Sequence, residues 1–291
     1  MKTYYILIFA FVIGSCTRFD NGMLEDKIPS QNNLNLISYD NFDLGFEKIE
    51  EGKMHNYLMQ FIVSNWSICS KDSIGMSNEY KRILFSKSNE ICAKYNFNIS
   101  EYEKIVESID YGNIYSIVNN FDVEPENIVN NLIISDVLKA KLNQLNEIIN
   151  TISNTENVEQ IQNSILIFYI NNQFDLNNLE LKLFGAYVDV AMHSTKFWLP
   201  IYAGGENKLS ELFSHLEGNC RSNNNQLRKI HWGKLICIDA LTTVSTAALS
   251  IVNSGGGAAL PNPLLGGLPT AGLAGVIGGI AGSGTYAIAS W

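Results

Sequence analysis

The C-terminal segment Trp232–Trp291 constrains this chain more than any other feature. After Asp239 it contains no Lys, Arg, Asp or Glu, and half of the chain's 22 glycines lie between Gly255 and Gly284. An uncharged segment of this length has to be covered by a bilayer, by a partner or by the rest of the chain, unless it stays disordered.

This tail divides into three parts. Trp232–Val252 is apolar except for Lys234 and Asp239, Asn253–Pro269 contains a run of three glycines and three prolines, and Thr270–Trp291 is again apolar. Proline and glycine at that density interrupt a helix. The tail therefore predicts a hairpin of two apolar helices.

Small residues recur at helical spacing in the second apolar part. On a helix they form a smooth ridge, which in lipid is a packing surface for another helix. In water, glycine costs about 1 kcal/mol per helical position relative to alanine, so this helix needs a partner or a bilayer. The expected helix-packing residues are Ala271, Gly275, Gly278, Gly279 and Gly282.

The sequence leaves the setting of the tail open between a bilayer, a partner helix, a glycine-rich core element and a disordered segment. Asp239 would cost about 3 kcal/mol at the centre of a bilayer. An unpaired buried charge is costly, so Asp239 needs a polar partner or water wherever the helix is covered. On a helix it shares a face with Trp232, Leu235 and Ile236, and His231 lies about two turns away.

The N-terminus has the pattern of a secretion signal. Lys2 precedes the apolar run Tyr4–Ile13, which is too short to span a membrane. The run ends in Ile13-Gly14-Ser15-Cys16, which resembles the lipobox of bacterial lipoproteins. The resemblance implies that residues 1–15 are removed as a signal peptide and that Cys16 is acylated, with palmitate as one expected acyl chain. Several acyl chains hold a protein in a bilayer essentially permanently.

Thr17, rather than Asp, follows the cysteine. By the sorting rule of such lipoproteins, this implies the outer membrane of a cell envelope, with the leaflet left open. Residues 16–37 are polar and predict a tether.

Residues 38–231 predict an irregular helical domain, so the fold class is mainly α. Apolar residues recur at intervals of three and four, most clearly in one stripe from Ile134 to Ile152. Pro125 suits the first turn of that helix, and Ser100 with Glu103 suits a capping box. The other expected helices are Phe42–Trp66, Asn78–Tyr95, Tyr102–Val118, Val158–Asn172 and Leu179–Trp198.

Charge and cysteine spacing argue against several partners. The chain has 20 basic and 29 acidic residues, a net charge of −9, and no basic patch, so we expect no nucleic-acid binding. No Cys/His spacing typical of a metal site occurs, and we expect no cofactor and no metal. With Cys16 acylated, four cysteines remain, which allow three disulfide pairings or free thiols: Cys69, Cys92, Cys220 and Cys237.

The candidates for catalysis are few. His55, His193, His215 and His231 are scattered along the chain, and no HExxH or GxSxG motif occurs. A lone histidine near apolar residues is usually structural. We therefore expect no catalytic residue and no enzymatic activity.

One wider resemblance covers the last third of the chain. The segment Ser194-Thr195-Lys196-Phe197-Trp198, then Trp232-Gly233, Asp239-Ala240 and a glycine-rich tail, resembles a group of uncharacterised exported proteins of Bacteroidota. That group implies no activity. The tail alone resembles the glycine-zipper helices of class II bacteriocins.

Two functions follow as expectations. The first is a non-enzymatic, lipid-anchored envelope protein whose tail packs in a membrane, against a partner helix or in a homo-oligomer. The second is a bacteriocin-like antagonist that permeabilises membranes through the tail.

Overall fold

Helices account for almost all regular structure in the part of the chain that is described. The computed structural model describes residues 44–46, 50–118, 123–153, 157–219, 230–253 and 270–290. Within these ranges there is no β-strand, so the predicted mainly α fold is confirmed. The described helices belong to one compact unit, Phe42–Trp291.

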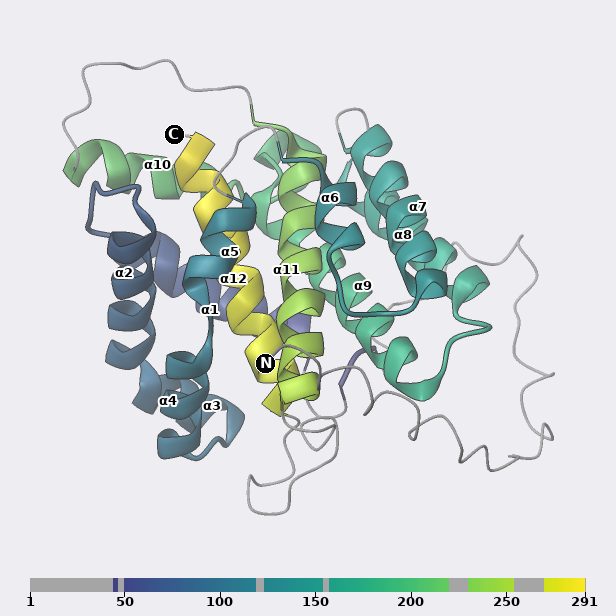
Figure 1. Cartoon of the computed structure of the whole chain (residues 1–291). Helices are drawn as coiled ribbons and strands as arrows, with labels where there is room; N and C mark the ends of the chain where they lie inside the picture. The colour runs from purple at the N-terminus through teal and green to yellow at the C-terminus, as the bar shows by residue number, and fades with distance from the viewer. Residues whose placement is uncertain are drawn as a thin grey trace, which may run out of the picture. The chain divides into compact units, whose positions relative to one another are not determined.

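The elements are labelled in Figure 1. They are α1 (Glu51–Asn65), α2 (Ser73–Ser86), α3 (Ser88–Tyr95), α4 (Ile99–Ser108), α5 (Tyr111–Val118), α6 (Pro125–Asn130), α7 (Asp136–Ile152), α8 (Val158–Asn172), α9 (Asn178–Trp198), the short 3-10 helix η3 (Ile201–Ala203), α10 (Lys208–Asn219), α11 (Trp232–Asn253) and α12 (Thr270–Ser290).

Asparagine side chains fix the starts of two long helices. Asn157 and Gln160 form a reciprocal capping box at the start of α8, and Asn177 and Glu180 form one at α9. Each box satisfies backbone N–H groups that have no partner inside the helix. These caps explain why both helices begin within one residue of their predicted starts.

Three helices that the sequence predicts as continuous are each divided in two. The expected helix Asn78–Tyr95 is wrong because α2 ends at Ser86 and α3 begins at Ser88. The expected helix Tyr102–Val118 is wrong because α4 ends at Ser108 and Asp110 accepts from the backbone N–H of Asn113 at 2.9 Å, which starts α5. The cap of α4 is Asn98, not Ser100 with Glu103.

The helix expected to run from Pro125 to Ile152 is interrupted for a similar reason. Helix α6 ends at Asn130, and the Ser135 hydroxyl accepts from the N–H of Leu138 at 3.2 Å, so that α7 begins afresh. A serine or aspartate side chain that bonds to the backbone competes with helix continuation, and apolar periodicity does not record this.

The two tail helices, α11 and α12, pack along each other and lie among the other helices. Figure 1 shows α12 between α5 and α11. Helix α12 also contacts α1 and α4, whereas α11 also contacts α9, α7 and α6. Outside this centre, α8 packs on α7 and α9, and α2 packs on α1, α4 and α5.

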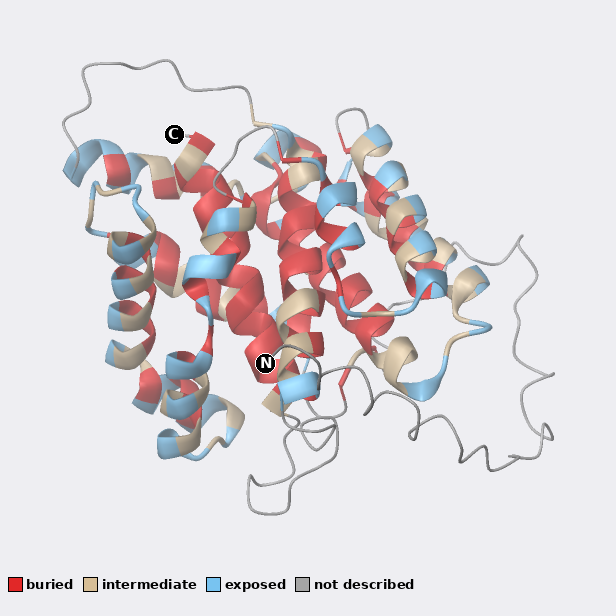
Figure 2. Ribbon diagram, viewed as in Figure 1, coloured by how far each residue is buried: buried red, intermediate tan, exposed pale blue. Residues whose placement is uncertain are grey.

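Burial follows this arrangement, as Figure 2 shows. Every described residue of α12 is buried except Thr270 and Ala289. The tail helices are also the two described helices that are long and apolar enough to cross a membrane, by length and composition alone. In this structure they form part of the core.

A candidate functional site around Asp239

The carboxylate of Asp239, on α11, is held by three side chains from two other helices. Its Oδ1 lies 3.0 Å from Nε2 of His55 on α1. Its Oδ2 accepts hydrogen bonds from Ser194 Oγ at 2.5 Å and from Trp198 Nε1 at 2.6 Å, both on α9. We call these four residues the Asp239 cluster.

Helix geometry brings the cluster together. Ser194 and Trp198 are one turn apart on α9, so their side chains share a face and reach the same oxygen. All four residues have 0% exposed surface, so the hydrogen bonds form away from water. Helix α12 closes the site, because a Cβ atom at Gly279 would lie 3.2 Å from Cδ2 of His55 and 3.1 Å from the backbone oxygen of Asp239.

A second set of contacts holds His55 in place. Its Nδ1 lies 3.1 Å from Oδ1 of Asn56, whose amide donates to the backbone oxygen of His193 at 2.9 Å. Close by, the backbone N–H of Gly52 donates to Asp189 Oδ2 at 2.7 Å. Because Gly52 lies in the first turn of α1, this bond satisfies an amide that has no acceptor within the helix.

The electrostatics of the pair favour a protonated imidazole. Burial by itself lowers the pKa of His55, but the charge and hydrogen bond of Asp239 oppose it, with smaller contributions from Asn56 and Asp189. The balance raises the pKa of His55 above its ordinary value. Asp239 therefore favours the protonated form of His55, and Ser194 and Trp198 are additional neutral donors to the carboxylate.

The cluster contains serine, histidine and aspartate, but not in the arrangement of a hydrolase triad. In such a triad the hydroxyl bonds to the imidazole, which the carboxylate orients from the other side. Here the Ser194 hydroxyl donates to Asp239, and no atom of the set is accessible to a substrate. What the arrangement does chemically is join α1 and α9 to α11 through one carboxylate.

The glycines expected at the packing ridge face α11. Cβ atoms added at Gly275, Gly278 and Gly282 would contact or overlap residues of α11, which are Thr243 with Ala247, Thr246 and Thr242 respectively. Ala271 is fully buried. Cys16, the expected acylation site, lies outside the described residues.

Two of the four remaining cysteines are free. Cys92 and Cys237 are buried free thiols, so neither of the pairings between sequence neighbours, Cys69–Cys92 and Cys220–Cys237, forms. Cys69 is disulfide-bonded. A disulfide involving Cys237 therefore does not hold α11 to the domain.

The expectation that Asp239 needs a polar partner is confirmed, but sequence reasoning named His231 as the nearest histidine and missed His55. The other two partners, Ser194 and Trp198, lie in one of the segments that resemble the Bacteroidota group, and Asp239 lies in another. No signal in the sequence connects His55 with Asp239.

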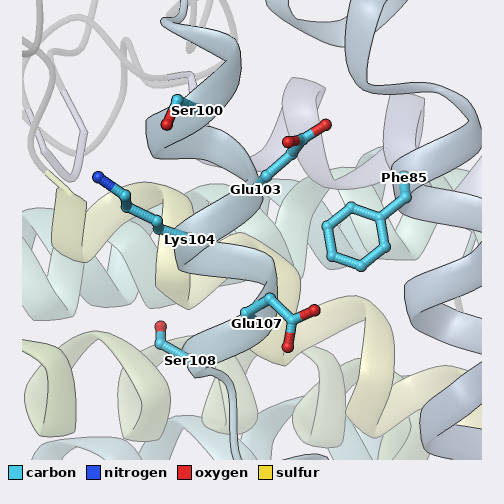
Figure 3. Close-up of a pocket in the computed structure, with 6 residues that line it drawn as sticks. All are labelled: Phe85, Ser100, Glu103, Lys104, Glu107 and Ser108. Carbon is cyan, nitrogen blue, oxygen red and sulfur yellow. The ribbon is translucent and has the colours of Figure 1, made fainter.

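The surface hollows are weaker candidates for a functional site than the Asp239 cluster. One hollow, of about 630 Å³, lies between α2 and α4 and is shown in Figure 3. Its lining residues are Phe85, Ser100, Glu103, Lys104, Glu107 and Ser108. Most of these side chains are exposed to solvent, and Glu107 pairs with Lys81 at 3.3 Å. Within the described residues, no group of three His, Cys, Asp or Glu side chains is placed to hold a metal ion.

Comparison with known proteins does not assign this chain to a family. No protein-family model, no curated protein and no solved structure matches this chain.

Proposed function

We propose that this protein is a non-enzymatic, lipid-anchored component of a bacterial cell envelope that keeps its apolar tail helices inside its own helical domain. One observation carries the proposal. The tail's only carboxylate, Asp239, is bonded to three residues outside the tail, and both tail helices are largely buried.

In this arrangement, the role of the other helices is to cover the tail. Tail helices that α1, α5 and α9 already cover need no second subunit to bury them. The partner helix that the glycine ridge requires is therefore α11 of the same chain, and the membrane contact of the resting protein comes from Cys16. A net charge of −9 keeps the domain off an anionic bilayer surface.

Acyl labelling tests the anchor. Cys16→Ala should abolish labelling with a palmitate analogue and move the protein into the soluble fraction, because the tail helices of the described structure are buried. Thr17→Ser is the matched control and should retain label and membrane association. Labelling that persists in Cys16→Ala would refute lipid anchoring at this residue.

A second candidate function is a secreted antagonist that permeabilises membranes through the tail. It is favoured by the length and composition of α11 and α12, each sufficient to cross a bilayer. Cys16→Ala protein that loses its label but stays with the membrane would favour this candidate.

A further inference from the structure

Five hydroxyl side chains of the tail helices are satisfied within their own helix. Hydroxyl groups on both helices donate to the backbone carbonyl one turn earlier in the same helix, and so need no partner elsewhere. The donors are Thr242 at 2.6 Å, Thr243 at 2.8 Å, Thr246 at 2.9 Å, Ser283 at 3.3 Å and Ser290 at 2.7 Å. In a bilayer, polar groups have to be satisfied within the inserted element, and these already are.

The contact between the tail helices is also independent of the rest of the chain. Gly275, Gly278 and Gly282 bring α12 close to α11, where the nearest atoms belong to Thr243, Thr246 and Thr242. Close helix approach through small residues is the packing that remains favourable in lipid, where the hydrophobic effect no longer drives association.

Asp239 differs from these hydroxyl groups. It is the last charged residue of the chain, and its three donors come from α1 and α9 rather than from the tail. Leaving these donors would expose a carboxylate to lipid and leave His55, Ser194 and Trp198 without their acceptor. The other charge on α11, Lys234, lies at the start of the helix, beside Glu124 at 2.7 Å.

Tyr80 makes another polar contact between the tail and the helices that cover it. Tyr80 on α2 donates to the backbone oxygen of Ala281 at 3.2 Å and lies 3.4 Å from the Thr285 hydroxyl. Loss of this contact leaves no unpaired charge on the tail. The Ala281 carbonyl and the Thr285 hydroxyl can each be satisfied within α12 instead.

We propose that α11 and α12 transfer together from the core of the domain into a lipid bilayer, and that the Asp239 cluster holds them back. The partner is a bilayer of lipids with no net charge, since the acidic chain is repelled by an anionic one. This proposal concerns the tail and does not require that Cys16 is acylated.

Flotation with phosphatidylcholine vesicles tests the proposal. Full-length protein carrying Cys16→Ala is used throughout, so that failure of acylation cannot affect the result. The informative variant is Ser194→Ala, because Ser194 lies on α9 and its replacement weakens the cluster without making the tail more apolar. We expect it to raise the rate of vesicle association about tenfold, the effect of losing one hydrogen bond to a buried charge.

The matched control is Ile165→Ala on α8. Ile165 is fully buried and α8 packs on α7 and α9, so this change loosens the domain without touching the Asp239 cluster. It should associate with vesicles at the rate of the Cys16→Ala parent. Asp239→Asn, which keeps the size of the side chain and removes its charge, should exceed Ser194→Ala.

The outcomes separate the alternatives. Faster association of both cluster variants, with Ile165→Ala unchanged, supports transfer controlled by the cluster. An equal rise in Ile165→Ala would show that any loosening suffices, and the assignment to the cluster would fail. If no variant floats with the vesicles, α11 and α12 are a permanent core and the proposal is overturned, whereas the proposed anchoring through Cys16 is unaffected.

Discussion

Nε2 of His55 lies 3.0 Å from Oδ1 of Asp239, a residue 184 positions further along the chain, and neither side chain has any exposed surface. The pair joins α1, at the beginning of the described helices, to the first tail helix. Because water reaches neither side chain, the polar atoms of the pair depend on each other, and the carboxylate depends also on Ser194 and Trp198.

Asp239→Asn should destabilise the fold strongly. Removing one partner of a buried ion pair typically costs about 3–5 kcal/mol, since the remaining donors keep their desolvation cost without the charge that repaid it. The measurement is the free energy of unfolding in urea. Asp175→Asn, the same change at an exposed residue that already has a positive φ of 67°, is the control and should stay close to wild type. Equal effects in the two variants would contradict the structural importance of Asp239.

The contribution of His55 to stability should depend on pH in a defined direction. A pKa raised above 6.5 in the folded state means that protonated His55 stabilises the fold fully below pH 6.5. That stabilisation is lost as the pH rises through the raised pKa. The groups that raise the pKa of His55 are Asp239 from α11, Asp189 from α9 and Asn56 from its own helix.

The measurement for this prediction is the difference in unfolding free energy between wild type and His55→Gln. We expect it to be larger at about pH 6 than at about pH 9. His215→Gln removes an imidazole from an exposed position of α10 and controls for the loss of a histidine. A difference that grows with pH would show that the imidazole is neutral in the folded protein.

The helices were predictable from apolar periodicity, but their ends were less so. Helix α8 has the predicted bounds because the start of its periodic pattern coincides with the Asn157 capping box. The breaks before α5 and α7 depend on single side chains, Asp110 and Ser135, that bond to the backbone. A polar residue inside a periodic stretch can as easily be solvated, so periodicity alone does not indicate such a break.

The sequence predicts that Asp239 has a polar partner but not which residue supplies it. The isolated charge of Asp239 in an apolar helix indicates that a polar partner exists, because an unpaired buried carboxylate is costly. Which residue supplies it is decided by how α1 packs against α9 and α11. That packing depends on close contacts such as Gly52 against Asp189, which no local pattern records.

Cys237 gives a native test of whether α11 lies in the core. Its thiol is free and fully buried, so a water-soluble thiol reagent should leave it unmodified in the folded protein and modify it in urea. Ser214→Cys, at an exposed position of α10, should react at once in the folded protein. The measurement is modification of each cysteine-containing peptide by mass spectrometry. Rapid native modification of Cys237 would place α11 at the surface.

Gly279→Ile tests whether the glycines of α12 serve close approach or only flexibility. A Cβ atom at Gly279 would overlap the Thr243 hydroxyl and lie 3.1 Å from the backbone oxygen of Asp239, both on α11. Overpacking of this kind costs about 1–3 kcal/mol. Isoleucine is the better helix former, so a helix that merely needs order would gain stability from the same change.

The two explanations therefore predict opposite signs for Gly279→Ile in urea unfolding. Gly218→Ile is the control, because a Cβ at that position of α10 meets no atom within 4 Å and the replacement should be neutral or stabilising. We expect Gly279→Ile to lower the free energy of unfolding and Gly218→Ile not to. If both variants are stabilised alike, α12 does not pack closely on α11, and the glycines provide only backbone freedom.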